Sequence, residues 1–327
     1  MEVGIEVGID VGIEVGIRVK TGHQAQANRV APLPIVQGVA PSYLRLPQGD
    51  WDGMLALLVE RFPAIDARTW RDRMARGQVV DGAGAPLAPD SAVRPGERIW
   101  YYRELDAETA IPFDEQVLFQ DEHLVVVDKP HFLPTMPSGR FLRETLLVRL
   151  KDKLGLGELT PIHRLDRETA GVVMFSSCVA SRGAYQSLFQ QRSVAKVYEA
   201  LAAPIAGLQL PHTHRSRMVE GTPFFRMQEV DGEPNSETVI ELIELRGLLA
   251  LYRLRPHTGR KHQLRLHMAS LGAPILNDPF YPLALACKGD DFSQPLQLLA
   301  RSIAFTDPLT GLVRAFASER ALEGDSA

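Results

Sequence analysis

The sequence predicts an α+β protein built on a largely antiparallel, mixed β-sheet with flanking helices. The chain has 327 residues, which favours two domains or one large domain with an appendage. Apolar residues make up 45% of it, enough to form a proper core. Between residues 112 and 318, segments with the pattern of strands follow one another through tight turns, with few helical segments between them. That order is typical of antiparallel pairing.

Residues 1–45 are expected to be a low-complexity extension followed by a linker. From Val3 to Val19 every odd position is Val or Ile, which is the alternation of a strand with one apolar face. Gly recurs every fourth residue, however, and no turn brings in a partner strand. Residues 20–45 are polar with scattered Pro. The whole segment is therefore predicted to be poorly ordered.

Residues 46–105 are predicted to form a small α/β module. Helical spacing of apolar residues covers 51–62, a second helix covers 67–76, and short strands with Gly-rich turns cover 77–82 and 94–102. Two helices followed by Gly-X-Val and Pro-Gly-Glu-Arg-Ile resemble the alpha-L-type RNA-binding module. The resemblance implies that Arg71, Arg73 and Arg76 meet phosphates; the alternative is a solvated helix face.

Residues 112–318 are predicted to form the main domain, followed by a tail at 319–327. Its first elements are a strand pair within 117–130 that Pro130 stops, a helix over 142–154 and a buried strand over 171–176. A helix over 180–191 and a strand over 195–202 follow. The remaining elements are strands at 238–245 and 248–255, a helix at 262–271, and strands at 298–305 and 313–317.

Charge and cysteine content narrow the function classes. The net charge of −4 argues weakly against a nucleic-acid partner, but Arg253 to His267 contains five Lys/Arg, three His and no acid. Such a local patch is what phosphates would meet. The two cysteines, Cys178 and Cys287, are too few for a disulfide framework and do not have the spacing of metal ligands. This cysteine content fits a reducing, cytoplasmic location. We expect no membrane span, no secretory signal and a monomer.

One segment carries the functional hypothesis. Residues 161–171 read Pro-Ile-His-Arg-Leu-Asp-Arg-Glu-Thr-Ala-Gly and precede an apolar strand. This resembles the His-Arg-Leu-Asp-x-x-Thr-x-Gly signature of the RluA family of pseudouridine synthases. Further segments resemble other motifs of that family in the same order, and the resemblance covers about 200 residues. These segments are 121–130, 195–201, 258–267, 272–281 and 298–307.

The resemblance implies a fold, a reaction and a partner. The sheet would carry a central cleft. A uridine in structured ribosomal or transfer RNA would be detached from its ribose at nitrogen 1, turned in the pocket and rejoined through carbon 5. No metal and no cofactor would be needed, and the sequence contains no metal-ligand cluster or phosphate-cradling Gly loop.

The resemblance assigns the chemistry to three residues. Asp166 would begin the reaction, either by attacking the sugar or by assisting formation of a glycal. A buried Asp stays ionised only beside a cation, and Arg265 is the family's candidate, so we expect an Asp166–Arg265 ion pair. Tyr198, in Lys-Val-Tyr, would stack on the uracil and move a proton. Without the motifs, each would be an ordinary surface or core residue.

Other residues are expected around these three. Arg164 would fill the space that the flipped base leaves, or else contact a phosphate. His163 is expected to hold the loop that presents Asp166. The other predicted RNA-binding residues are Arg167, Lys196, Arg255, Arg260, Lys261 and His262, with Arg253 beside them in the basic run, and the predicted pocket residues are Thr169, Leu264 and Leu298.

Two segments depart from the family pattern. Ala170 stands where the family usually has Ser. Residues 211–226 place His212 and His214 near two Phe residues and three Arg. His-x-His is a common start of a metal site, but no third ligand is apparent in the sequence, so no metal is expected and a substrate-specific RNA contact is favoured.

Two other function classes compete with the synthase hypothesis. A non-catalytic RNA-binding or ribosome-assembly protein could share the fold, but it would not need Asp166, Tyr198 and Arg265 together. A glycosidase usually needs two carboxylates across the sugar, and the sequence offers one strong candidate.

Overall fold

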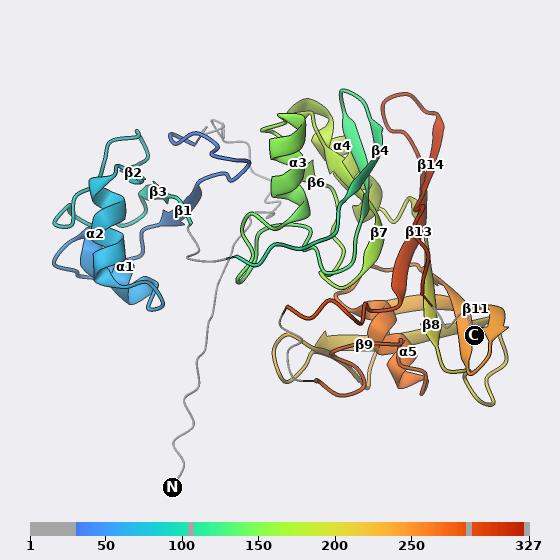
Figure 1. Cartoon of the computed structure of the whole chain (residues 1–327). Helices are drawn as coiled ribbons and strands as arrows, with labels where there is room; N and C mark the ends of the chain where they lie inside the picture. Colours follow the sequence, from blue (N-terminus) through green and yellow to red (C-terminus); the bar gives the residue numbers. More distant parts are fainter. Residues whose placement is uncertain (1–30, 104–107, 286–289, 324–327) are drawn as a thin grey trace, which may run out of the picture. The chain divides into compact units, whose positions relative to one another are not determined.

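The computed structural model describes residues 31–103, 108–285 and 290–323, which form two compact units on either side of residues 104–107 (Figure 1). The repeat at residues 3–19 lies outside the described residues. In the part of the chain that is described, no helix has both the length and the apolar character needed to cross a membrane.

The N-terminal unit packs two helices on a small antiparallel sheet. The helices are α1 (Met54–Arg61) and α2 (Ala67–Ala75), and the strands β1 (Ser42–Arg45), β2 (Val79–Asp81) and β3 (Arg98–Tyr101) lie in the order β1-β3-β2. Leu57, Leu58 and Trp70 from the helices meet Val79 and Ile99 from the strands in one core. The two helices and the strands at 79–81 and 98–101 match the predicted ones.

Two predictions for this region are wrong. β1 lies within residues 20–45, which were predicted to be linker; its edge pairing with β3 provides the order that its short, polar sequence does not suggest. Arg73 was predicted to meet phosphate, but it is buried, and its guanidinium lies 5.1 Å from the Trp70 ring. Arg71 is exposed on α2.

The described part of the C-terminal unit is one mixed, largely antiparallel sheet with three helices, so the predicted fold class is confirmed. Among the described residues, eleven strands join in the order β10-β9-β11-β12-β8-β13-β7-β5-β4, with β14 on β13 and β6 on β7. β13 and β7 are parallel, and the other pairs are antiparallel. The strands are β4 (Gln116–Gln120), β5 (Leu124–Lys129), β6 (Thr160–Pro161), β7 (Ala170–Ser176), β8 (Val194–Ala202), β9 (His212–Glu220), β10 (Met227–Val230), β11 (Ser236–Arg246), β12 (Leu249–Pro256), β13 (Leu298–Thr306) and β14 (Val313–Ala317).

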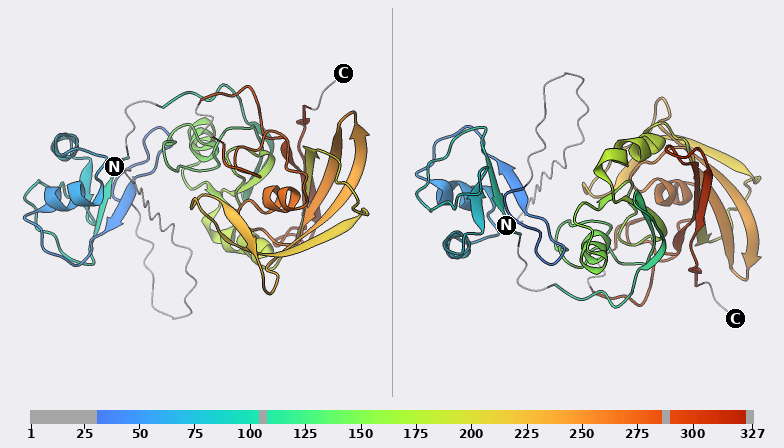
Figure 2. Two further views of the ribbon diagram at one scale, coloured as in Figure 1. Left: turned by 90° about the horizontal axis from the view of Figure 1, so that it is seen from below. Right: turned by 90° about the horizontal axis from the view of Figure 1, so that it is seen from above.

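The helices cover different halves of this sheet. α3 (Leu146–Leu154) contributes Leu146 and Leu150 to a core with β5 and β7, while α4 (Val179–Gln190) packs on β7. α5 (Gln263–Ser270) lies on the inner side of the curved yellow and orange strands in Figure 2 and packs Leu264 and Met268 against β8 and β12. Tyr198 on β8 contacts both of these cores. The middle of the sheet is therefore where the two halves meet.

Three features of this unit differ from the prediction. β9 and β10 were not predicted, because the alternation along β9 is carried by polar residues rather than apolar ones. α3 begins at Leu146 instead of Leu142, because the carboxylate of Glu108 accepts from the backbone N–H groups of residues 142–144 and Thr145 caps the helix. The described part of the predicted tail packs on the unit: Leu322 is buried and Arg320 bonds to the backbone oxygen of Asp128.

Candidate active site

Asp166 lies in the loop between β6 and β7, and several buried contacts fix that loop. The Thr135 hydroxyl donates to the Leu165 carbonyl at 2.8 Å and accepts from the Leu165 N–H at 3.2 Å. The Thr169 N–H donates to the Asp166 carbonyl at 3.2 Å. With its backbone held on both sides, Asp166 presents its side chain, which is 25% exposed, in a defined direction.

Lys129 at the end of β5 holds the same loop from beneath. Its ammonium donates to the carbonyls of Pro130, Leu133 and Arg167 at 2.9, 2.8 and 3.2 Å. Burial lowers the pKa of Lys129 to about 7. Three carbonyl acceptors match the three N–H groups of the protonated form, so this contact set favours the charged lysine.

Arg265 lies beside Asp166, as predicted. Its Nη1 donates to Asp166 Oδ2 at 3.2 Å, and the side chain is 1% exposed. A second carboxylate fixes its orientation: Nε and Nη2 donate to the two oxygens of Asp278 at 2.8 and 2.6 Å. The guanidinium also lies 4.8 Å from the Phe280 ring. The bidentate bond to fully buried Asp278 sets the plane of the guanidinium and leaves Nη1 for Asp166.

The charges around Asp166 keep it ionised. Burial alone would raise the pKa of its carboxyl group, but the nearby charges of His262, Arg265 and Arg164 and the hydrogen bond from Arg265 bring the pKa below its ordinary value. His262 Nε2 lies 3.7 Å from Asp166 Oδ2. Burial lowers the pKa of His262 to about 4, so this ring is charged only in the acid range where Asp166 itself titrates. Near pH 7 the ring is neutral, and Arg265 is the cation in contact with Asp166.

The second carboxylate oxygen of Asp166 has no such partner. Both Arg265 and His262 approach Oδ2. Within the part of the chain that the structure describes, Oδ1 makes no hydrogen bond or ion pair, and Asp166 borders a cavity. Among the described residues, one oxygen of Asp166 is thus held by the arginine, and the other has no hydrogen-bond or ion-pair partner at the edge of the cavity.

Tyr198 lies behind this cavity rather than in its wall. It is half-buried, and burial together with the negative charge of Asp166 raises the pKa of its phenol, so the hydroxyl keeps its proton. The described residues that line the cavity do not include Tyr198. Its ring contacts the two cores that meet at the middle of the sheet.

The cavity has a volume of about 420 Å³ and is lined by segments far apart in the sequence. Residues 134–141 form one wall of the cavity, and residues 164–168 form its base. Residues 261, 262 and 265, in and just before the first turn of α5, form a further side. The rings of Phe225 and Phe280 close another side, 5.1 Å apart. The predicted pocket residues Thr169, Leu264 and Leu298 are buried and are not among the described residues that line it. Leu264 and Leu298 belong to the core between α5 and the sheet.

Arg164 and Lys261 are the predicted RNA-binding residues that border the cavity with exposed side chains. Lys261 Nζ donates to the Phe224 carbonyl at 3.5 Å. Within the described residues, the guanidinium of Arg164 makes no hydrogen bond or ion pair. Arg167 also borders the cavity, but it bonds to Glu168 at 3.0 Å and to the Phe132 carbonyl at 3.1 Å.

The remaining predicted RNA contacts lie elsewhere or are used within the protein. Tyr252 and Leu254 face α5, so Arg253 and Arg255 on the same strand face the opposite side of the sheet, where both lie near Glu241. The expectation that these two arginines surround the cleft is wrong. Lys196 donates to the Thr258 carbonyl and Arg260 to that of Asn235.

His163 holds the loop, as its sequence position suggested. Its Nε2 accepts from the Met174 N–H at 3.1 Å, and its ring stacks on Phe189 at 4.7 Å. Burial lowers the pKa of His163 to about 3, so the ring is neutral at all physiological pH values. A neutral imidazole that accepts a backbone bond is a structural element.

Sequence reasoning missed Asp278, Phe280 and the wall at 134–141. Asp278 and Phe280 fall in the segment 272–281 that resembled a family motif, but nothing local gave them a role. Asp278 also accepts from the N–H groups of Phe280 and Tyr281 at 2.8 and 3.2 Å, so one carboxylate holds both the turn and Arg265. A carboxylate next to Pro in that motif was the signal that could have found it.

Comparisons with known proteins identify RNA pseudouridine synthases as relatives of this chain. The family model described as RNA pseudouridylate synthase matches residues 123–270. The dual-specificity RNA pseudouridine synthase RluA of Haemophilus influenzae is 34% identical over 174 residues, covering 50% of this chain and 76% of that protein. The mitochondrial tRNA pseudouridine(32) synthase of Saccharomyces cerevisiae is 30% identical over 241 residues, covering 70% of this chain and 50% of that protein.

Among solved structures, human RNA Pseudouridylate Synthase Domain Containing 1 has a TM-score of 0.52 and 21% sequence identity, covering 65% of this chain and 86% of that one. That similarity concerns the fold. The chain spans about half the length of the yeast relative and about three quarters of the Haemophilus one.

Proposed function

The chain belongs to the RluA family of RNA pseudouridine synthases, and we propose that it isomerises uridine in structured RNA with Asp166 as its catalytic carboxylate. The observation that carries the proposal is the pairing of Asp166 Oδ2 with buried Arg265 at 3.2 Å at the base of a cavity. Attack on the sugar and acceptance of a proton from it both require an ionised carboxylate. The lowered pKa of Asp166 provides that state at neutral pH.

The other residues have separate tasks in this proposal. Arg265 keeps Asp166 charged and oriented, and Asp278 fixes Arg265. Tyr198 does not line the cavity, but it keeps its proton next to the charge of Asp166, and we assign it a contact with the uracil once RNA is bound. Arg164 enters the stack when the target base leaves it, since its exposed guanidinium borders the cavity.

The RNA is of the structured kind, ribosomal or transfer RNA, and the yeast relative's name supports transfer RNA among these. Lys261 and Arg164 would meet phosphates or bases at the cavity mouth, and Arg71 on α2 of the N-terminal unit is a separate candidate for a phosphate contact. We place the enzyme in a reducing compartment, the cytoplasm, as a monomer; the free thiol of Cys178 is consistent with that compartment.

An in vitro assay tests the proposal directly. The protein is incubated with tRNA and rRNA transcripts, and pseudouridine is detected by its carbodiimide-resistant adduct. Asp166→Asn should remove activity by at least about 10³-fold, because the amide cannot act as a nucleophile or base. Asp152→Asn, an exposed acid on α3, serves as the matched control and should keep full activity.

Binding and modification are measured together, because a non-catalytic RNA-binding protein on the same fold would bind RNA without forming pseudouridine. Asp166→Asn should still bind the RNA, since phosphate contacts are made by other residues. Pseudouridine formation by the Asp166→Asn protein would refute the role of Asp166 as the catalytic carboxylate. A wild-type protein that binds RNA but modifies none of the transcripts would favour the binding role.

A further inference from the structure

Three side chains outside the candidate active site meet where β9, β10 and α5 come together. They are His214 on β9, Glu229 on β10 and His267 on α5. His214 Nε2 lies 2.9 Å from Glu229 Oε1, and His267 Nε2 lies 3.9 Å from the same oxygen. One ligand atom from each residue lies within 4.8 Å of the other two.

We propose that His214, Glu229 and His267 bind a divalent transition-metal ion, with zinc as the ion that their two nitrogens and one oxygen fit best. Zinc takes such ligands at about 2.0–2.1 Å in a tetrahedron, which separates neighbouring ligand atoms by roughly 3.3 Å. The separations of 2.9 and 3.9 Å to Glu229 bracket that value, and the nitrogens of the two histidines lie within 4.8 Å of each other. Side-chain shifts of about 1 Å would bring the three ligand atoms to the distances that zinc requires. Three protein ligands leave the fourth position for water.

The surroundings of His267 suit a metal ligand. Its ring is fully buried, and Nδ1 lies 2.9 Å from Thr238 Oγ1. Oγ1 can accept a hydrogen bond from Nδ1–H, and that tautomer leaves the lone pair of Nε2 for the ion. Ser216 and Ser236 now contact Nε2 at 3.2 and 3.0 Å. If the ion binds Nε2, the two hydroxyls lose this contact but still hydrogen-bond to each other at 3.1 Å. The Ser236 hydroxyl also still donates to the Ser216 carbonyl at 2.8 Å.

The charge states agree with this geometry. Burial lowers the pKa of His267 to about 4, so the ring is neutral near pH 7 and has a lone pair to offer. Burial alone would raise the pKa of Glu229, but hydrogen bonds from His214 and Ser216 bring it below its ordinary value, so the carboxylate is ionised.

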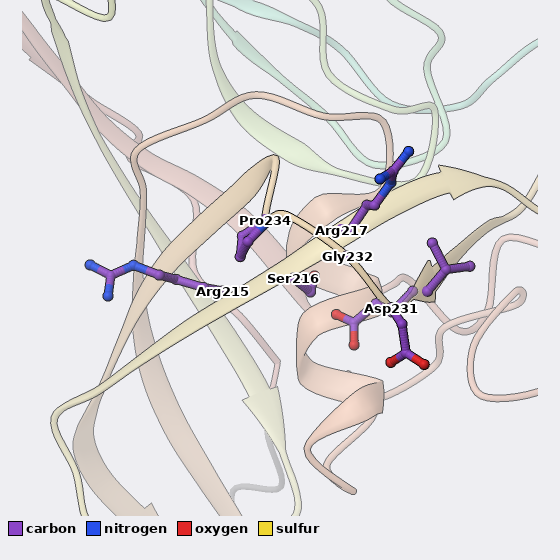
Figure 3. A pocket seen from close by; sticks show the side chains of 8 residues that line it. Arg215, Ser216, Arg217, Asp231, Gly232 and Pro234 are labelled. Atoms are coloured by element: carbon purple, nitrogen blue, oxygen red, sulfur yellow. The ribbon is translucent and has the colours of Figure 1, made fainter.

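One member of the cluster, Glu229, borders an open pocket. Figure 3 shows Arg215, Ser216 and Arg217 following one another along β9, with the turn Asp231–Pro234 beside them. Glu229 borders this pocket, whose volume is about 470 Å³. Arg215 and Arg217 are exposed on the face of β9 opposite His214, because side chains alternate along a strand, and Arg215 is paired with Glu237 at 2.6 Å.

The metal would tie the β9–β10 hairpin to α5. His267 stands two residues after Arg265 on that helix, so metal binding would reinforce the element that carries the partner of Asp166. The site itself does not depend on the proposed function: the protein can bind zinc whether or not it modifies RNA.

Zinc binding is measured on the full chain after it is stripped with a chelator, by titration calorimetry with Zn²⁺ and by elemental analysis after dialysis. We expect one zinc per chain and a rise in the melting temperature with Zn²⁺. His214→Ala and Glu229→Gln, whose side chains are 16% and 22% exposed, should fold and bind zinc at least about tenfold more weakly.

His257→Ala is the matched control. His257 also pairs with a glutamate, Glu237, at 2.6 Å, but no second histidine belongs to that pair among the described residues. This variant should bind zinc like the wild type. Less than one zinc per chain in the wild type, or equal affinity in His214→Ala and His257→Ala, would overturn the proposal.

Discussion

At the scale of single residues, the arrangement of Arg265 between two carboxylates is the central feature. Fully buried Asp278 accepts hydrogen bonds from Nε and Nη2 of Arg265, while partly exposed Asp166 accepts one from Nη1. The arginine is therefore oriented by the buried acid and works on the accessible one. Breaking such a buried pair by removing one partner costs about 3–5 kcal/mol, so an inactive Arg265→Ala protein would not separate a catalytic from a structural role.

Arg164 allows a cleaner residue-level prediction. Because its exposed side chain has no partner within the described residues, Arg164→Ala should leave the melting temperature unchanged. If Arg164 stabilises the flipped state, its loss should lower kcat/KM by roughly 10–100-fold, since flipping costs a few kcal/mol. Steady-state kinetics on the modified transcript provide the measurement. Arg192→Ala, an exposed arginine in the turn before β8, is the control, and equal kinetics for both variants would rule out the flipping role.

At the scale of elements, the start of β7 decides how the Asp166 loop meets the rest of the sheet. β7 pairs in parallel with β13 there, with Gly171 opposite Ala300. Gly171 has φ +112°, and a Cβ at this position would lie 2.3 Å from the Ala300 oxygen. Only glycine permits the approach, which brings the strand after Asp166 against the strand beside Tyr198.

A pair of glycine substitutions tests this contact. Gly171→Ala should lower the free energy of unfolding by more than about 2 kcal/mol, because both the backbone angle and the backbone contact oppose a methyl group. Gly183→Ala in α4, where a Cβ meets nothing within 4 Å, should instead stabilise the protein by about 0.5–1 kcal/mol. Urea denaturation measures both, and a Gly171→Ala protein as stable as the wild type would show that the two strands can separate without cost.

At the scale of the whole molecule, burial of neutral histidines makes stability depend on pH. Burial lowers the pKa of His131, His262 and His267 to about 4. It lowers that of His163 to about 3. All four would titrate near 6.5 in the unfolded chain. Protons therefore bind the unfolded state more readily as the pH falls from about 6.5 towards 4, and stability is lost over that window.

The expected size follows from the same linkage. Between pH 7.5 and 5.5 each of the four histidines should remove on the order of 1 kcal/mol from the free energy of unfolding of the C-terminal unit. Urea denaturation at the two pH values gives the drop. His163→Gln, whose side-chain oxygen can still accept from the Met174 N–H, should reduce the drop by about one histidine's share. An unchanged pH dependence in this variant would contradict the assignment.

The sequence by itself determined the fold class, most elements of the C-terminal unit and the loop that carries Asp166. Apolar alternation and helical spacing are local, so they appear in a short window of sequence. The family motifs added the pairing of Asp166 with Arg265, because a motif records residues that meet in space even when 98 others lie between them.

Only the tertiary structure decided which basic residues face the cavity and which acids hold the site. Arg253 and Arg255 turn away because a two-residue alternation on β12 sends Tyr252 and Leu254 towards α5. The Asp278–Arg265 bond and the meeting of His214 with Glu229 and His267 likewise depend on strand register and on how α5 packs inside the sheet. These are relations between distant segments, so a local pattern could single out a residue such as Asp278 but could not identify the partner that it meets.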